Sequence, residues 1–216
     1  MCFPITRRNA FVGLLIFLCA SCVINRFRME MNTREIDASL KNCPITRDFF
    51  VGTFSCSQIP PLPLSKRRRG WILNVDPSGP GTHWVAAFVN ERNKIWYFDS
   101  TAEEPNKYIQ AFLNQFSAVE KLNFRLQNFF SDICGQYCVY FIYSCCKKKS
   151  FERIVGRFSR TNLAKNDAFI KKWIVRFLRR NLNAPLSDLS SIKAECKSAQ
   201  SVSQHEPPVG RVGDFH

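Results

Sequence analysis

The stretch CGQYCVYFIYSCC, residues 134–146, decides the core of the fold. Its apolar residues recur at positions i, i+3, i+4 and i+7, which is the spacing of a helix: Cys138, Phe141, Ile142 and Cys145. Either Ser131 or Asp132 can cap the start of this helix, and three lysines at 147–149 complement the negative end of its dipole. We therefore predict one buried helix over this stretch.

A hairpin pattern precedes this helix. Residues 83–89 (HWVAAFV) are apolar enough for a buried strand, residues 90–94 form a polar turn, and residues 95–98 (IWYF) predict a second strand. An antiparallel hairpin brings the outer ends of its two strands together. We therefore expect His83 and Asp99 to lie near each other at one end of the sheet.

The remaining patterns indicate an α+β domain. They predict a strand at 71–75, an amphipathic helix at 103–116, a strand at 122–126 and a last amphipathic helix at 166–181. A chain of 216 residues with 45% hydrophobic content can bury one good core. We expect one domain with appendages.

Four residues in this framework together supply the chemistry of a thiol protease: His83, Asp99, Gln127 and Cys134. Backbone amides in the first turn of a helix favour a thiolate at Cys134, and a carboxylate beside His83 fixes the imidazole tautomer. The amide of Gln127 can stabilise an oxyanion, and Gly135 leaves room for a substrate backbone. A structural histidine or a buried thiol is the commoner interpretation of either residue alone. The four roles together favour catalysis.

These residues carry a family resemblance. The strings GTHWVAAFVN, YFDS and CGQYCVYF, with a glutamine seven residues before the cysteine (134 minus 127), resemble the adenovirus endopeptidase family, adenain, and its relatives in large virus-like DNA transposons. Upstream, NCPITRDFFVGTFS at 42–55 is similar to the amino-terminal part of that protease. The likeness covers roughly 31–182, which is most of the chain.

The resemblance implies a papain-like α+β fold of the adenain type, with a central mixed sheet packed against the helix that bears the nucleophile. It implies Cys134 as nucleophile, His83 as general base, Asp99 as orienting acid and Gln127 as oxyanion donor. Family substrates are capsid and core precursor proteins, and DNA is a cofactor. SUMO- or ubiquitin-deconjugating isopeptidases share the order of these residues and form the enzymatic alternative.

Two departures from the family pattern limit what the resemblance implies. Adenain is activated partly by a peptide joined through a disulfide, and near Phe116, where its cysteine would fall, this chain has none. An activating peptide is therefore expected to bind without that disulfide, if one exists. The acidic residue is Asp99 where adenain carries glutamate, and aspartate can take the same orienting role.

The formal net charge of +14 indicates a polyanionic partner. In the last predicted helix the cationic residues lie on or near the face opposite the apolar one: Lys171, Lys172, Arg176, Arg179 and Arg180. They are candidates for DNA contacts that are independent of sequence and sensitive to salt, or they form a solvated face. The charge run at 66–69 has the same two interpretations. A rival from another class is a DNA-binding, capsid-associated protein with a vestigial triad.

The ten cysteines have no spacing typical of a zinc module, so we expect no metal and mostly reduced, buried thiols. Only Cys19 and Cys22 form a C-x-x-C pair, and no second pair or nearby histidine completes it.

Composition divides the chain into three parts. Residues 1–30 form an apolar extension that resembles a signal or anchor, or reflects translation that starts at Met29 or Met31; a membrane contact depends on its retention. Residues 31–184 form the protease-like domain, and 185–216 a disordered polar tail. We expect a monomer located in the nucleus or in a virion-like particle.

Overall fold

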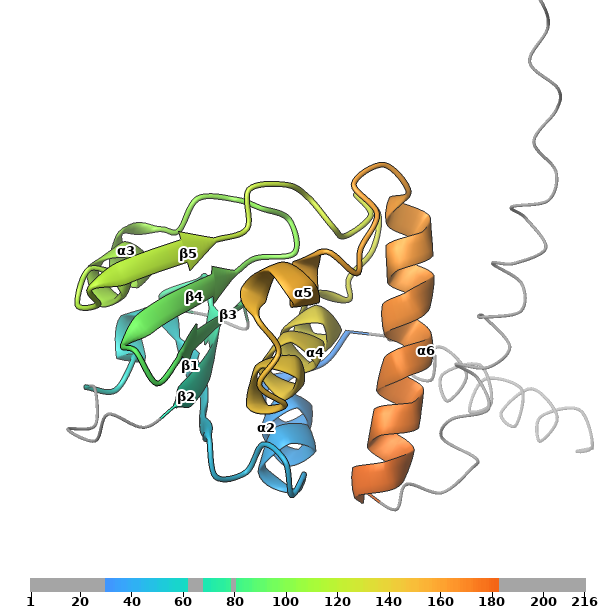
Figure 1. Cartoon of the computed structure of the whole chain (residues 1–216), viewed down its shortest axis with the longest axis horizontal. Helices are drawn as coiled ribbons and strands as arrows, with labels where there is room; N and C mark the ends of the chain where they lie inside the picture. The colour runs from blue at the N-terminus through green and yellow to red at the C-terminus, as the bar shows by residue number, and fades with distance from the viewer. Residues whose placement is uncertain (1–29, 62–67, 79–80, 183–216) are drawn as a thin grey trace, which may run out of the picture.

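The computed structural model describes residues 30–61, 68–78 and 81–182. Five strands form one mixed sheet with helices on both faces (Figure 1). The strands are β1 (Phe50–Ser55), β2 (Arg69–Asn74), β3 (Trp84–Val89), β4 (Lys94–Phe98) and β5 (Ala118–Lys121). The helices are α2 (Thr33–Lys41), the short 3-10 helix η1 (Cys56–Gln58), α3 (Lys107–Leu113), α4 (Cys134–Cys146), α5 (Phe151–Val155) and α6 (Leu163–Leu182).

The strands lie in the sheet in chain order. β1 is parallel to β2, β2 and β4 are both antiparallel to β3, and β5 is parallel to β4. The register of β1 shifts between Phe50 and Gly52, and β5 is only four residues long. Lys94 on β4 pairs with Glu120 on β5 at 2.6 Å, and Lys121 on β5 pairs with Glu104.

The predicted hairpin is confirmed in β3 and β4. Val89 lies opposite Ile95 near the turn, and Ala86 lies opposite Phe98 toward the open end. His83 directly precedes β3 and Asp99 directly follows β4, so both residues lie at the open end.

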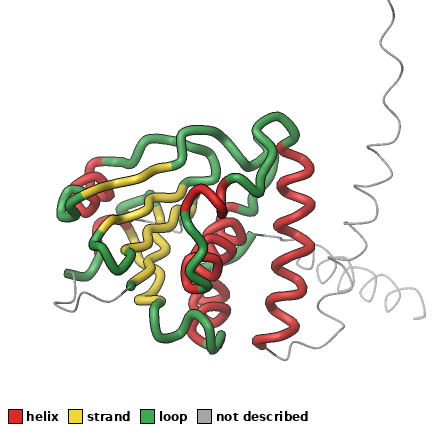
Figure 2. Tube along the Cα trace, viewed as in Figure 1, coloured by secondary structure: helices red, strands yellow, loops and turns green. Residues whose placement is uncertain are grey.

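Helices cover both faces of the sheet because its central strands are apolar on both sides (Figure 2). On one face Ile72, Ala86, Phe88 and Phe98 pack with residues of α4, which is buried almost throughout. On the other face a second cluster joins the sheet to α3 and contains Trp71, Leu73, Val85, Ala87, Ile109 and Phe112. The prediction of a buried helix at 134–146 is confirmed. The packing of this helix on the sheet fixes the position of its first residue, Cys134.

The prediction of a strand at 122–126 is wrong, because the fifth strand occupies 118–121 instead. The helix predicted at 103–116 is shorter and begins after Asn106, whose side chain accepts hydrogen bonds from the amides of Tyr108 and Ile109. That leaves 118–121 free to pair with β4. Beyond β5 the chain leaves the ladder, because the amides of Leu126 and Gln127 donate to the carbonyl of Ser100.

The predicted cap of α4 is also wrong. Ile133 occupies the capping position, and no described side chain caps this helix; neither Ser131 nor Asp132 takes that role. The amides of the first turn therefore remain available beside Cys134. The last helix begins three residues earlier than predicted, since Asn162 accepts a hydrogen bond from the amide of Lys165.

Some sequence predictions fall outside the described residues. They concern 1–29, most of the Pro-rich loop and basic run, and the tail from 185 onward. Within the described ranges no helix combines the length and the apolar character needed to cross a bilayer.

Candidate active site

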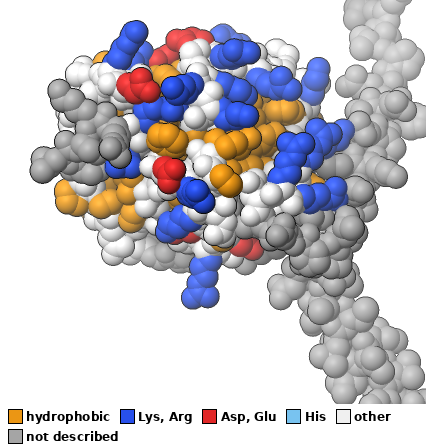
Figure 3. Space-filling model, turned by 60° about the horizontal axis from the view of Figure 1, so that its bottom comes forward, with side chains coloured by type: hydrophobic (Ala, Val, Ile, Leu, Met, Phe, Trp, Pro, Cys, Tyr) orange, Lys and Arg blue, Asp and Glu red, His pale blue; other side chains and the backbone are white. Residues whose placement is uncertain are grey.

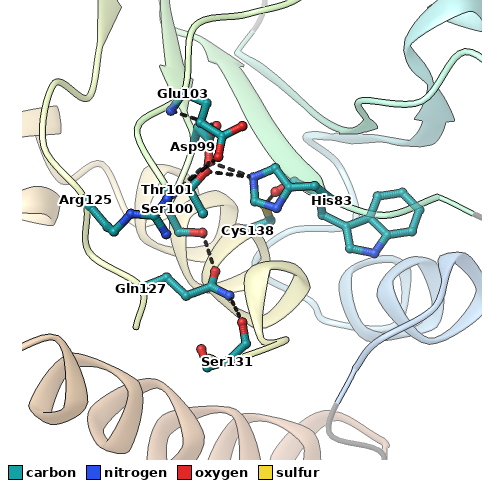
Figure 4. Close-up of polar contacts among 10 residues, drawn as sticks. His83, Asp99, Ser100, Thr101, Glu103, Arg125, Gln127, Ser131 and Cys138 are labelled. Atoms are coloured by element: carbon teal, nitrogen blue, oxygen red, sulfur yellow. Dashed lines mark hydrogen bonds and ion pairs between the residues drawn. The ribbon is translucent and has the colours of Figure 1, made fainter. Parts of the chain in front are cut away.

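The open end of the hairpin brings His83 and Asp99 into contact, as the spacing predicted. The Nε2 atom of His83 lies 2.7 Å from Oδ1 of Asp99, and the hydroxyl of Thr101 lies 3.3 Å from the same nitrogen (Figure 4). The His83 carbonyl accepts a hydrogen bond from the amide of Val75, which directly follows β2. Backbone and side chain of His83 are both positioned by the sheet.

Asp99 is buried, with 2% of its surface exposed, and several donors surround its carboxylate. The amide and hydroxyl of Thr101 both donate to Oδ1 at 2.8 Å, and the amide of Glu103 donates to Oδ2 at 3.2 Å. Burial alone raises the pKa of Asp99, but the hydrogen bond and charge of His83 and the hydrogen bonds from Thr101 lower it below its usual value. Asp99 is therefore an ionised acceptor for the imidazole.

Cys134 is the first residue of α4 and is buried, and its side chain is one of the groups that act on the imidazole of His83. Burial by itself lowers the pKa of His83, but hydrogen bonds and charge interactions with Asp99 and Cys134 raise it to about 10. The imidazole of His83 is therefore protonated at neutral pH. Because Nε2 faces Asp99, Nδ1 is the nitrogen available to the sulfur of Cys134.

Gln127 is held in a fixed orientation near this group. Its Oε1 accepts a hydrogen bond from the hydroxyl of Ser100 at 2.7 Å, and its Nε2 donates to the carbonyl of Ser131 (Figure 4). The Ser100 carbonyl also accepts hydrogen bonds from the backbone amides of Leu126 and Gln127. The bond to Ser131 uses one of the two amide hydrogens of Gln127, which leaves the second for another acceptor.

Ser100 and Thr101 are the residues of the site that the sequence did not reveal. Both directly follow Asp99, so a search of the residues beside the predicted acid would have found them. Their contacts depend on the turn after β4, which carries Asp99 and Ser100 toward different partners. No periodic pattern in the sequence encodes that turn.

The structure gives Gly135 a packing role that the sequence did not predict. A Cβ atom at this position would lie 3.2 Å from Met31 Cβ, 3.3 Å from Ile36 Cδ1 and 3.4 Å from Trp84 Cδ1. The absence of a side chain at Gly135 therefore allows close packing of α4 against Met31, α2 and β3.

The five cations considered for DNA lie along α6, which packs beside α4 on the side away from the sheet (Figure 1). Arg176 and Arg180 are exposed, whereas Lys171, Lys172 and Arg179 are partly buried. They share one helix, and they are separate from the group around His83. In the described part of the chain no cluster of three or more His, Cys, Asp and Glu side chains could hold a metal ion.

Comparisons with known proteins give a viral relative in sequence and weaker likenesses in structure. No family model matches the chain. Over 113 residues the chain is 33% identical to a protein of Acanthamoeba polyphaga mimivirus that carries the provisional name thiol protease R355. The match covers 45% of this chain and 37% of the mimivirus protein, so the chain spans little more than a third of that relative. The likeness and the geometry at Cys134 together support the class of thiol proteases.

Solved structures give weaker likenesses. The ASFV pS273R protease matches 45% of this chain and 41% of its own at 25% identity, with a TM-score of 0.37. The central domain of the Lpg1148 protein from Legionella pneumophila matches 80% and 98% at 11% identity, with a TM-score of 0.39. A de-sumoylating protease matches 63% and 58% at 14% identity, with a TM-score of 0.30. Because all three TM-scores are below 0.5, these structures carry no argument about the chemistry of this chain.

Proposed function

We propose that the chain is a cysteine endopeptidase with a papain-like fold of the adenain type. One observation carries this proposal: His83 contacts Asp99 at 2.7 Å, and Cys134, the first residue of a buried helix, is among the groups that raise the pKa of the same imidazole. A nucleophile, a base and a residue that orients the base then belong to one group of side chains. A protein with a vestigial triad has no need to keep these contacts.

The proposed reaction is acyl transfer in two steps. The Cys134 thiolate attacks the scissile carbonyl carbon, a C–S bond forms, and the carbonyl electrons move to the oxygen. The amide of Gln127 and the backbone amide of Cys134 stabilise this oxyanion. His83 donates its proton to the leaving amine as the C–N bond breaks. Water, deprotonated by His83, then hydrolyses the thioester and frees Cys134.

The substrates and partners come from the family resemblance and are part of the proposal. Substrates are capsid or core precursor proteins of a virus or virus-like transposon, and residues 31–184 are the protease domain. DNA acts as a cofactor through the cations of α6, and the enzyme works as a monomer in the nucleus or in a virion-like particle. These cations carry several positive charges on one helix, which suits a phosphate backbone.

Alkylation of the full chain tests the enzymatic proposal without knowledge of the substrate. One of the ten cysteines, Cys134, should react with iodoacetamide far faster than the other nine, because only a thiolate is a strong nucleophile. Burial raises the pKa of Cys138 and of Cys145, which keeps both as thiols. Peptide mapping by mass spectrometry gives the rates, with and without DNA. Uniform slow labelling of all ten would favour the DNA-binding rival.

The pH dependence of cleavage should change when Asp99 is replaced by asparagine. The protonated form of His83 is needed for proton donation, so the wild-type kcat/KM should fall as pH rises through about 10. Asp99 raises the pKa of His83, so Asp99→Asn should move this alkaline limb to lower pH. Glu103→Gln is the matched control, because the exposed Glu103 carboxylate pairs with Arg125 and not with His83. An alkaline limb at the same pH in Asp99→Asn would refute this role.

Removal of the Ser100 hydroxyl should slow cleavage without removing any group that contacts the substrate. Ser100→Ala frees the Gln127 amide to rotate, and kcat should fall by about 10-fold to 100-fold, less than the loss of an oxyanion donor. Gln127→Ala and the double variant complete a cycle measured by steady-state kinetics. If Ser100 acts only through Gln127, the double variant should be no slower than Gln127→Ala, whereas additive losses would contradict this role.

A further inference from the structure

A second concave site lies at the other end of α4 from Cys134. A cavity of about 300 Å³ opens where the start of β2, the turn after β3 and the end of α4 meet. Its lining includes Arg68, Phe88, Trp96, Cys145, Lys148 and Lys149. Cys145 is eleven residues beyond Cys134 in the same helix, which corresponds to about 16 Å along the helix axis.

Arg68 forms the cationic floor of this cavity. Only 8% of the residue is exposed, and its guanidinium lies over the rings of Phe49 at 4.9 Å and Phe88 at 5.5 Å. It donates a hydrogen bond to the Cys145 carbonyl, and no acidic side chain among the residues that the structure describes forms an ion pair with it. A buried arginine keeps its charge and is costly to leave without an anion.

Further cations surround the opening. Arg92, Lys148 and Lys149 line the cavity, against the single carboxylate of Glu91. Burial and repulsion from Arg157, Arg153 and Lys147 lower the pKa of Lys149, so this end of the molecule has a local excess of positive charge. On the face shown in Figure 3, Lys and Arg side chains predominate over acidic ones around an apolar area.

Trp96 gives the cavity an apolar wall and an unused donor. Its ring stacks on Phe88 with centroids 6.2 Å apart and an interplanar angle of 23°. Its Nε1 atom is buried and finds no hydrogen-bond acceptor within the described ranges. A buried donor without an acceptor is uncommon in a folded protein.

We infer that this cavity binds a ligand with two or more phosphate groups. Phosphate supplies several acceptor oxygens and up to two negative charges per group, which matches the fork of Arg68 and the neighbouring cations. The ligand is either a small phosphorylated molecule or a phosphate segment of a nucleic acid, and the same cations recognise both. The site is separate from Cys134, so this inference does not depend on proteolytic activity.

The test measures binding of inorganic tripolyphosphate to the full chain by isothermal titration calorimetry at 150 mM salt. Because Arg68 is part of the folded core, the cavity is changed at its rim with the double variant Arg92→Gln/Lys149→Gln. We expect at least a 10-fold loss of affinity in this variant. The matched control Arg34→Gln/Lys107→Gln removes the same charge from α2 and α3, outside the cavity lining, and should bind as the wild type does.

Two further measurements decide the ligand class. Tricarballylate, which has three carboxylates, should bind at least 10-fold more weakly than tripolyphosphate. A single-stranded oligonucleotide displaced by tripolyphosphate would identify nucleic acid as the phosphate source, and an oligonucleotide that is not displaced would leave the small molecule as the source. The inference is overturned if tripolyphosphate does not bind, if both double variants lose affinity equally, or if tricarballylate binds as tightly.

Discussion

Cleavage of a glycine-containing capsid-type peptide by the full chain should fall to background when Cys134 is replaced by alanine. The variant loses the nucleophile, and loss of such a group in a protease reduces kcat by a factor on the order of 10⁶. The contact between His83 and Asp99, 2.7 Å in the wild type, should remain in this variant, but no covalent intermediate can form. The measurement is the initial rate of peptide cleavage, with and without DNA.

Cys138→Ala is the control for this experiment. Cys138 lies one turn further along α4, and its thiol donates a hydrogen bond to the Trp84 carbonyl. This variant should keep its cleavage rate within about threefold, because the loss of one weak buried hydrogen bond costs little. Residual cleavage by Cys134→Ala would contradict the proposed nucleophile. No cleavage by the wild type, with intact salt-sensitive DNA binding in both proteins, would favour the DNA-binding rival.

The free energy of unfolding should fall by about 3–5 kcal/mol when Phe141 is replaced by alanine. Phe141 is fully buried in the middle of α4, stacks on Phe98 with centroids 4.6 Å apart at 11°, and meets the Phe151 ring edge-on at 6.1 Å. Its removal leaves a cavity between the helix and the sheet, where the surrounding residues cannot collapse fully. Urea denaturation followed by circular dichroism measures the change.

Phe130→Ala is the matched surface control. Phe130 is 98% exposed, so its truncation should change stability by no more than about 0.5 kcal/mol. A loss below about 1.5 kcal/mol for Phe141→Ala would mean that α4 does not anchor the core in the way its burial indicates.

The sequence predicted the parts of the fold that depend on short-range patterns. The apolar run at 134–146 predicted α4. Two apolar runs separated by a polar turn predicted β3 and β4, and the predicted bounds of both strands lie within one residue of the observed bounds. The hairpin alone predicted the contact between His83 and Asp99. Periodicity and turn chemistry determine these features locally, so a single sequence contains the information.

Long-range contacts explain what was missed. The four residues of β5 are mostly exposed, so they show no burial pattern, and their pairing with β4 makes them a strand. The backbone amides of Leu126 and Gln127 donate to the Ser100 carbonyl and leave the strand ladder. Ser100 is distant from both in sequence, so no local pattern reveals this contact. Likewise, the contact of Gly135 with the residues around α2 depends on the packing of two distant segments. The roles of the four candidate catalytic residues stay predictions until the variants are measured.

The order of the strands has a consequence for self-association. Because the sheet follows chain order, β1 and β5 are its two edges, and an unprotected edge can pair with a second chain and aggregate. Both edges carry protective features. The register shift at Phe50 and Gly52 interrupts β1, while β5 is short and holds charged residues in ion pairs with Lys94 and Glu104. The described part of the chain thus discourages growth of the sheet by edge pairing.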